Sequence, residues 1–195
     1  MKRVLVPVAD GSEDIETSSI TDVLVRCNID VVVASVMNGR KDVTLARKLH
    51  LIAPHCIEDC TKLTFDAILL PGGMPGATHL GASQHLVQLL KAQMAAGRLY
   101  GAICAAPAVA LAPNGLLEGI SRATCYPGLK GNLSLCGVTW EPLPVVLCRN
   151  CLTSQGPGTA ILFALTAAEL LVGQEVAQQV AKAMLVDFRS MVGKL

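Results

Sequence analysis

One cysteine of this chain lies in a sequence typical of a nucleophile at a sharp strand-to-helix turn. Cys104 follows the apolar run 99–103, has alanines two positions before and after it, Ala102 and Ala106, and is followed by Pro107. Such a turn requires small neighbours, and proline fits the first turn of a helix. A helix N-terminus lowers the pKa of a nearby thiol. The pattern therefore favours a reactive thiolate over an inert core cysteine.

Two further segments follow strand-like runs and carry groups that can act on such a thiol. The acidic turn 10–16 follows the first run, and the glycine-rich loop 71–76 follows the third. Glycines let backbone N–H groups approach a ligand closely, and the carboxyl ends of parallel strands share one edge of a sheet. Glu13 and Asp14 are explained by the preference of acids for the first turn of a helix, and the role of Glu16 is left open at this point.

The other cysteines give weaker signals. Cys148 and Cys151 form one C-x-x-C between two strand-like runs, as a hairpin turn would, and their role is left open. A zinc ribbon needs a second pair, and the cluster of His55, Cys56 and Cys60 is a weak metal candidate, so we predict no metal site. The remaining cysteines are expected to be small buried hydrophobic residues: Cys27, Cys125 and Cys136.

The positions of the histidines disfavour two classes of cysteine enzyme. Glutamine amidotransferases on similar sheets place a histidine well downstream of the cysteine, and related peptidases place one directly after it. Here residue 105 is alanine, and all four histidines precede Cys104. An upstream histidine remains possible as a partner, but none is expected at a strand end: His50, His55, His79 or His85.

Composition limits the class of protein. The chain has 195 residues with a net charge of +1, and we expect one domain over 1–195. No basic stripe indicates specific nucleic-acid binding, and apolar runs such as 161–168 are too short to span a membrane. The N-terminal residues show no signal-peptide pattern, so we expect a cytoplasmic protein whose eight cysteines are free thiols.

The elements that must position these residues alternate between strands and helices. The spacing of apolar residues predicts one helix around 86–94 and another around 176–184. Strands alternating with helices indicate a mostly parallel, doubly wound α/β sheet. The predicted strands are continuous apolar runs, typical of a sheet covered on both faces: 4–8, 31–34, 67–70, 99–103 and 145–147.

Four segments in order make the chain similar to the ThiJ/PfpI superfamily, specifically its DJ-one branch. The resemblance covers essentially the whole chain and is carried by 11–17, 70–73, 102–107 and 152–159. The bacterial ThiJ/YajL-like members look most similar because of three features: Ala106, Gln155 and the Pro-Gly-Thr-Ala run. The resemblance implies a flavodoxin-like three-layer sandwich and a homodimer.

The resemblance also assigns roles to site residues. It makes Cys104 the nucleophile and Glu16 a protonated carboxyl that donates a hydrogen bond to the thiolate. The backbone amides of Gly73 and Ala105, with Gly72 beside them, correspond to an anion-binding site for an oxyanion or an oxidised sulfur.

At three positions this chain departs from the pattern of the family or the role of the residue is open. Several members place a histidine beside the cysteine, where this chain has Tyr126, which orients a substrate but is a poor base at neutral pH. Proton transfer then falls to Glu16, Cys104 or water. Arg47 corresponds to a position that can contribute across the dimer interface, or it is a solvated surface arginine. Ala53 replaces a cysteine that some members carry near the interface, so no thiol-linked dimer is expected there.

Two functions follow from the resemblance, and they share the same residues. The first is a cofactor-independent glyoxalase or protein deglycase that acts on methylglyoxal-type α-oxoaldehydes and on glycated proteins. The second is a non-catalytic redox sensor or chaperone in which Cys104 is oxidised to a sulfinate. A nucleotide- or flavin-binding module has little support, because no Walker or G-x-G-x-x-G loop is present, and Asp10 lacks partners for a phosphoacceptor role.

Overall fold

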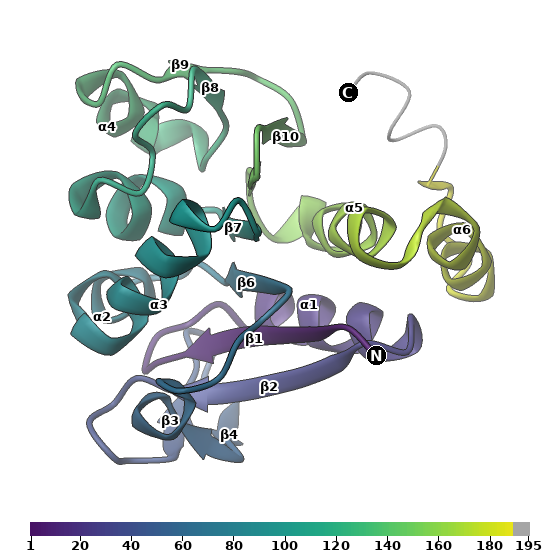
Figure 1. Ribbon diagram of the computed structural model, residues 1–195, viewed down its shortest axis with the longest axis horizontal. Helices are drawn as coiled ribbons and strands as arrows, with labels where there is room; N and C mark the ends of the chain where they lie inside the picture. The colour runs from purple at the N-terminus through teal and green to yellow at the C-terminus, as the bar shows by residue number, and fades with distance from the viewer. Residues whose placement is uncertain (189–195) are drawn as a thin grey trace.

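The computed structural model describes residues 1–188 and shows a three-layer α/β sandwich of the flavodoxin-like type (Figure 1). Seven strands form the main sheet in the order β10-β11-β7-β6-β1-β2-β5, and only β10 runs antiparallel to its neighbour. The main-sheet strands are β1 (Arg3–Val8), β2 (Asp30–Ser35), β5 (His55–Cys56), β6 (Ala67–Leu70), β7 (Leu99–Ile103), β10 (Val145–Cys148) and β11 (Cys151–Ser154).

Two short strand pairs and two layers of helices complete the described chain. The pairs are β3 (Asp42–Thr44) with β4 (His50–Ile52), and β8 (Arg122–Ala123) with β9 (Thr139–Trp140). The helices are α1 (Asp14–Arg26), α2 (Gly76–Ala82), α3 (Gln84–Ala95), α4 (Lys130–Leu135), α5 (Ala160–Val172) and α6 (Gln174–Ala183). Short helical turns are η1 (Ile57–Cys60), η2 (Pro107–Leu111), η3 (Ala112–Asn114), η4 (Pro127–Leu129) and η5 (Pro157–Thr159).

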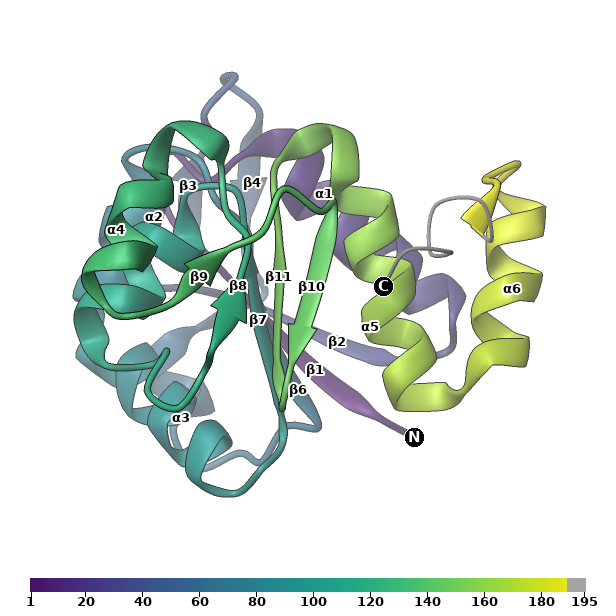
Figure 2. The ribbon, with the colours of Figure 1, turned by 90° about the horizontal axis from the view of Figure 1, so that it is seen from above.

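The five predicted strands are all present. The central strands β6 and β7 are buried along almost their whole length, as expected for a sheet covered on both faces. Helices α1, α5 and α6 cover one face, whereas α2, α3 and η2 lie on the other (Figure 2). Both predicted helices are confirmed as α3 and α6, but the fully buried residues of α6 are Ala177 and Ala181 rather than its valines.

The cysteines are all free thiols, as expected, but one prediction of burial is wrong. Cys27 and Cys125 are buried, whereas Cys136 is exposed because it caps the end of the short helix α4 at the surface. The hairpin turn predicted between Cys148 and Cys151 is confirmed, since the two residues pair directly across β10 and β11.

The strand order brings the predicted chemistry to one edge of the sheet. The parallel strands β1, β6 and β7 are neighbours, so the segments that follow their carboxyl ends meet there. These segments carry Glu16, the glycine loop and Cys104. Within residues 1–188, no helix is long and apolar enough to cross a membrane.

Candidate active site

Cys104 occupies a strained backbone position directly after β7. Its φ of 64° lies in the left-handed region, which is unfavourable for residues with a Cβ atom. Two hydrogen bonds hold it there: the Cys104 N–H donates to the Ser154 carbonyl at 2.9 Å, and the Cys104 carbonyl accepts from the Tyr126 N–H at 2.8 Å. The neighbours Ala105 and Ala106 are buried, so the predicted tight elbow with small residues is confirmed.

The helix after this elbow is irregular. Pro107 lies at its start, as predicted, and the π-helical turn Pro107–Leu111 continues directly into the 3₁₀ turn Ala112–Asn114. Such a turn contributes little macrodipole. The groups that stabilise negative charge on the sulfur are instead the backbone N–H groups of Gly73 and Ala105, which hydrogen-bond to it and lower the pKa of Cys104.

Glu16 is brought beside this sulfur by the first turn of α1. Its side chain is fully buried, and its Oε2 accepts a hydrogen bond from the Gly72 N–H at 2.7 Å. The carboxylate of Glu13 caps the helix by accepting from the Glu16 N–H at 2.8 Å, which fixes the start of α1. Within residues 1–188, Oε1 of Glu16 has no hydrogen-bond partner with good geometry. The side chain that interacts with this carboxyl group is the Cys104 thiol.

Burial raises the pKa of Glu16 to about 7. The Gly72 N–H and the Cys104 side chain oppose this change by stabilising the carboxylate, and the charge of Glu13 adds to it. At neutral pH the site therefore contains comparable amounts of neutral and ionised Glu16. The role implied by the resemblance, a protonated Glu16 that donates to a Cys104 thiolate, stays a prediction.

Burial and, to a smaller extent, the ionised carboxylate of Glu16 together raise the pKa of Cys104 to about 12. The N–H groups of Gly73 and Ala105 only partly offset these effects. The predicted lowering of the thiol pKa is therefore wrong, because burial of the sulfur outweighs the nearby N–H groups. Between the pKa values of about 7 and about 12 the pair carries one negative charge. Transfer of the thiol proton from Cys104 to Glu16 moves this negative charge from Glu16 to Cys104.

The glycine loop leaves no room for side chains at the site. A Cβ atom on Gly72 would lie 2.7 Å from the Cβ of Cys104, and one on Gly73 would lie 2.3 Å from the Gly11 carbonyl oxygen. Gly73 also has a φ of 85°. The prediction that Gly72 contributes an anion-binding amide needs correction, because its N–H is already bonded to Glu16. Gly72 positions the acid, whereas Gly73 and Ala105 face the sulfur.

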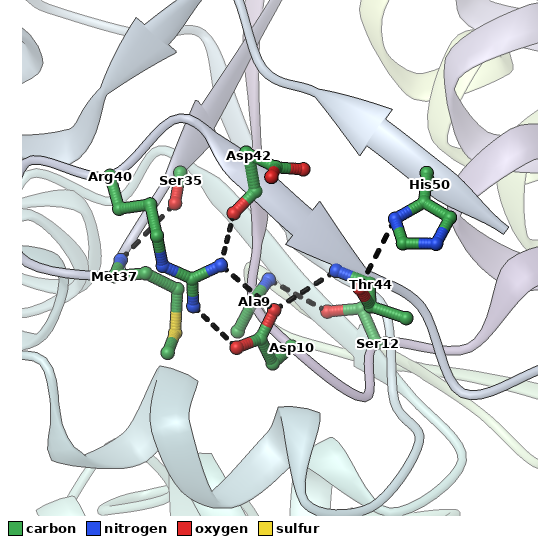
Figure 3. A network of polar contacts seen from close by, with 9 residues as sticks. All are labelled: Ala9, Asp10, Ser12, Ser35, Met37, Arg40, Asp42, Thr44 and His50. Carbon is green, nitrogen blue, oxygen red and sulfur yellow. Dashed lines mark hydrogen bonds and ion pairs between the residues drawn. The ribbon is translucent and has the colours of Figure 1, made fainter. Parts of the chain in front are cut away.

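A polar network holds the loop that leads from β1 into α1 (Figure 3). Asp10 accepts from the Thr44 N–H at 2.9 Å and pairs with Arg40. The hydrogen bond from Arg40 holds the pKa of Asp10 below its usual value. The Gly11 N–H donates to the Thr44 carbonyl at 2.8 Å, which ties the loop to β3. Asp10 therefore positions the acidic turn, a role that its place at a strand end did not reveal.

Asp14 has a second role beside its place in the first turn of α1. Its carboxylate accepts from the N–H groups of Arg47 at 2.7 Å and Leu49 at 3.2 Å. This contact fixes the loop between β3 and β4 against the helix that carries Glu16. The Arg47 side chain is exposed, so its contribution to the site stays a prediction.

Tyr126 contacts Cys104 through its backbone. Its N–H donates to the Cys104 carbonyl, whereas its side chain is 51% exposed, and its role as a substrate-orienting residue stays a prediction. His50 is paired with Thr44, and no histidine contributes to the pKa shift of Cys104. Sequence reasoning missed Ser154 as the residue that anchors the elbow. Its place at the end of a strand beside β7 is the signal that identifies it.

The chain matches one protein family over most of its length. The model of the DJ-1/PfpI family matches residues 2–170. Protein dj-1beta of Drosophila melanogaster is 40% identical over 96% of this chain and 98% of its own. The glutathione-independent glyoxalase DJR-1.2 of Caenorhabditis elegans is 36% identical, covering 92% of each. Protein DJ-1 homolog B of Arabidopsis thaliana is 41% identical over 94% of this chain, which spans only 41% of that longer relative.

Solved structures agree with the sequence relatives. Oxidized DJ-1 of Toxoplasma gondii superposes with a TM-score of 0.91 at 39% identity, covering 96% of this chain and 100% of that one. Drosophila melanogaster DJ-1beta gives a TM-score of 0.88 at 38% identity, covering 95% and 98%. These matches do not resolve a subgroup, so the ThiJ/YajL-like assignment stays a prediction.

Proposed function

This chain belongs to the DJ-1/PfpI family, and we propose that it is a cysteine-dependent, cofactor-independent glyoxalase or deglycase that acts on methylglyoxal-type α-oxoaldehydes and their early adducts. The observation that carries the proposal is the pairing of Cys104 with a buried acid whose pKa is raised to about 7. A similar protein, DJR-1.2, is named as a glutathione-independent glyoxalase.

The first step uses the shared proton of the pair. Ionised Glu16 accepts the Cys104 proton while the sulfur attacks the aldehyde carbon, which forms a C–S bond and a hemithioacetal oxyanion. The proton transfer makes Glu16 neutral, so the charge that raised the thiol pKa is removed as the bond forms. The N–H groups of Gly73 and Ala105 are placed to stabilise the negative charge.

The second step moves a hydrogen between adjacent carbons. Glu16 returns its proton to the oxyanion, and the resulting carboxylate then takes the proton from the former aldehyde carbon, which gives an enediolate. The hydroxyl proton passes from the former aldehyde oxygen to the former ketone oxygen, and Glu16 delivers its proton to the former ketone carbon. The product is a thioester of a 2-hydroxy acid on Cys104. Water then cleaves the C–S bond, which releases lactate from methylglyoxal and restores the thiol. The sum of the steps is one methylglyoxal and one water to one lactate and one proton.

The test is lactate formation from methylglyoxal without glutathione, with Cys104→Ala as the blank. We expect lactate only with the wild-type chain. Its rate should increase with pH, and the pH–rate profile should have a midpoint near 7, because the Cys104–Glu16 pair must lose one proton before it can react. A wild-type rate no greater than that of the blank would refute the enzyme proposal. Preformed adducts, assayed at a fixed concentration of free methylglyoxal, separate deglycase from glyoxalase activity.

A redox sensor is the second candidate, and one observation favours it. The N–H groups of Gly73 and Ala105 and a neutral Glu16 are donors that suit the oxygens of a sulfinate on Cys104. Mass spectrometry after mild peroxide treatment tests this candidate. We expect a two-oxygen adduct on the Cys104 peptide, and its absence would rule the sensor out.

We also propose that the active form is a homodimer joined through α1 and the β3–β4 pair. Between these elements lies a groove of about 520 Å³. Its lining includes three exposed apolar side chains, Val25, Leu49 and Ile52, which are 56%, 51% and 75% exposed. A second copy would cover these residues and bring the loop that carries Arg47 into the interface.

Sedimentation equilibrium tests the dimer. We expect Ile52→Asp to weaken association, because it places a charge in the apolar groove. Leu135→Asp is the matched control, since Leu135 is 88% exposed on α4, away from the groove. A wild-type chain that sediments as a monomer, or equal association of both variants, would contradict this interface.

A further inference from the structure

The C-x-x-C segment, which the proposed function does not use, forms a cross-strand pair at a hairpin turn. Cys148 ends β10 and Cys151 begins β11, and the two residues are direct partners in the antiparallel register. Direct partners have Cα atoms about 4.5 Å or about 5.5 Å apart, depending on their hydrogen bonding. Both separations fall within the range of about 4.4–6.8 Å found for disulfides.

The two thiols lie on the same face of the sheet. Directly opposite side chains point to one face, and the core contacts agree. Cys151 belongs to the core on the α2–α3 side and Cys148 packs against it, whereas the neighbouring pair Leu147 and Leu152 packs on the opposite side. Electrostatic coupling confirms that the thiols are close, since Cys148 contributes to the raised pKa of Cys151.

The two thiols differ in the way that a dithiol exchange centre requires. Cys148 is partly exposed, whereas Cys151 is buried. Burial alone would raise the pKa of Cys148. Instead it is lowered, because the Arg122 backbone N–H, the Ser121 hydroxyl and the Arg122 charge stabilise the thiolate. The Ser121 hydroxyl oxygen lies 3.6 Å from the sulfur. Burial raises the pKa of Cys151 to about 12, which leaves it as the protonated partner.

This pair is separate from the proposed active site. Cys151 pairs with Tyr100 near the start of β7, whereas Cys104 follows the end of the same strand. Four residues of strand place these positions about 13 Å apart. The hairpin thiols therefore do not resolve an oxidised Cys104 directly.

We propose that Cys148 and Cys151 form a second redox centre, a dithiol–disulfide couple that exchanges with small organic disulfides such as glutathione disulfide. The Cys148 thiolate attacks one sulfur of glutathione disulfide, which breaks its S–S bond and releases one glutathione thiolate. The Cys151 thiol then loses its proton to that leaving thiolate or to solvent and attacks Cys148. The second glutathione leaves, and the chain is oxidised by two electrons as glutathione disulfide is reduced to two glutathiones.

The charges around the turn suit this oxidant. Arg149 lies between the two cysteines and is exposed, and Arg122 acts on Cys148 electrostatically. The Arg149 charge favours approach of the carboxylates of glutathione, whereas the Arg122 charge is partly offset by Glu141, 3.6 Å away. A metal site is the competing use of a C-x-x-C, but residues 1–188 contain no cluster of three or more potential metal ligands.

The test is differential alkylation after exposure of the reduced full-length chain to glutathione disulfide. Trypsin cleaves after Arg149, so Cys148 and Cys151 fall on separate peptides, 131–149 and 150–182. We expect most copies of these two peptides to be joined by one disulfide, to the same extent in wild type and in Cys104→Ser. In Cys151→Ser the exchange stops halfway, and the glutathione adduct on Cys148 should rise roughly tenfold over wild type.

Two controls exclude other pairings. Cys136 shares the tryptic peptide of Cys148, so the joined peptides must persist in Cys136→Ser. A mixture of isotopically labelled and unlabelled chains must give no joined peptides of mixed mass. Equal glutathione adduct on Cys148 in wild type and Cys151→Ser would overturn the proposal. So would loss of the joined peptides in Cys136→Ser, or one zinc per reduced chain that depends on Cys148.

Discussion

The same pair of neighbouring strands, β7 and β11, has a cysteine site at each end, and the two sites are built in opposite ways. Cys104 depends on parts that are far apart in the sequence: the acid from α1, the glycine loop after β6 and the carbonyl of Ser154. Cys148 and Cys151 depend on a two-residue turn and the register of one hairpin. The first site is a product of the whole fold, whereas the second is local.

The two sites also differ in what controls the sulfur. At the elbow, burial suppresses ionisation, and reactivity depends on a proton held by Glu16. At the hairpin, the thiol is partly exposed and its ionisation is promoted by Ser121 and Arg122. We therefore expect the elbow to respond to changes in the acid and in packing, and the hairpin to respond to the thiol–disulfide balance of its surroundings.

The largest expected effect is on catalysis by the elbow. Glu16→Gln keeps an acceptor for the Gly72 N–H but removes the group that takes the Cys104 proton. Loss of a positioned general base lowers rates by about 10²–10⁴. We expect lactate formation to fall by that factor, while disulfide formation at Cys148 and Cys151 is unchanged. Glu175→Gln, on an exposed position of α6, is the control. Full activity of Glu16→Gln would remove Glu16 from the mechanism.

The difference between the two sites explains what the sequence was able to predict. The elbow, the glycine loop and the hairpin turn are each encoded by neighbouring residues, so Cys104, Gly73 and the Cys148–Cys151 turn were identified correctly in position. The pKa of Cys104 was not, because it depends on how deeply the packed helices bury the sulfur and on the charge of an acid from another element.

The same reason accounts for the residues that were missed or misassigned. Asp10 and Ser154 act through partners on other strands, Thr44 and Cys104, that periodicity does not reveal. Gly72 lies at the site, as predicted, but the partner of its N–H was not predicted. Only the packing of α1 shows that this N–H donates a hydrogen bond to Glu16.

The next effect concerns stability, and it again distinguishes the elbow from the hairpin. The folded-state pKa of Glu16, about 7, is above its usual value of 4.5, so the folded chain binds this proton more tightly than the unfolded chain. That stabilisation is fully present below about pH 4.5 and is lost as the pH rises through 7. Such a shift corresponds to about 3 kcal/mol.

Glu16→Gln isolates this contribution. We expect its free energy of unfolding, relative to wild type, to increase by about 3 kcal/mol between pH 4.5 and pH 8.5, because glutamine does not ionise. Denaturant titrations of both chains at several pH values provide the measurement, with Ser134→Ala, which removes no ionisable group, as a variant that should show no such trend. A constant difference between wild type and Glu16→Gln would show that the acid is not raised in pKa.

A smaller change tests the packing of the elbow. Gly72→Ala places a Cβ atom 2.7 Å from the Cβ of Cys104 and 2.7 Å from the Ile103 carbonyl oxygen. Overpacking of this kind costs about 1–3 kcal/mol. We expect lower stability and lower lactate formation, measured on the same preparation. Gly131→Ala on α4 is the control, since nothing lies within 4 Å of its added Cβ. Equal stability of the two variants would contradict the close contact.

The smallest effect belongs to the hairpin and concerns the ionisation of Cys148. Ser121→Ala removes the hydroxyl 3.6 Å from the sulfur but leaves the backbone N–H groups and the Arg122 charge, so the pKa of Cys148 should rise only slightly. We expect about a twofold slower alkylation of Cys148 at pH 7 and no difference at a pH where the thiol is fully ionised. Ser134→Ala, on α4, should leave both rates unchanged. A twofold loss that persists at high pH would mean that the Ser121 hydroxyl governs access to the sulfur rather than its charge. The ionisation of Cys148 would then depend on the backbone N–H groups of Ser121 and Arg122 and on the Arg122 charge.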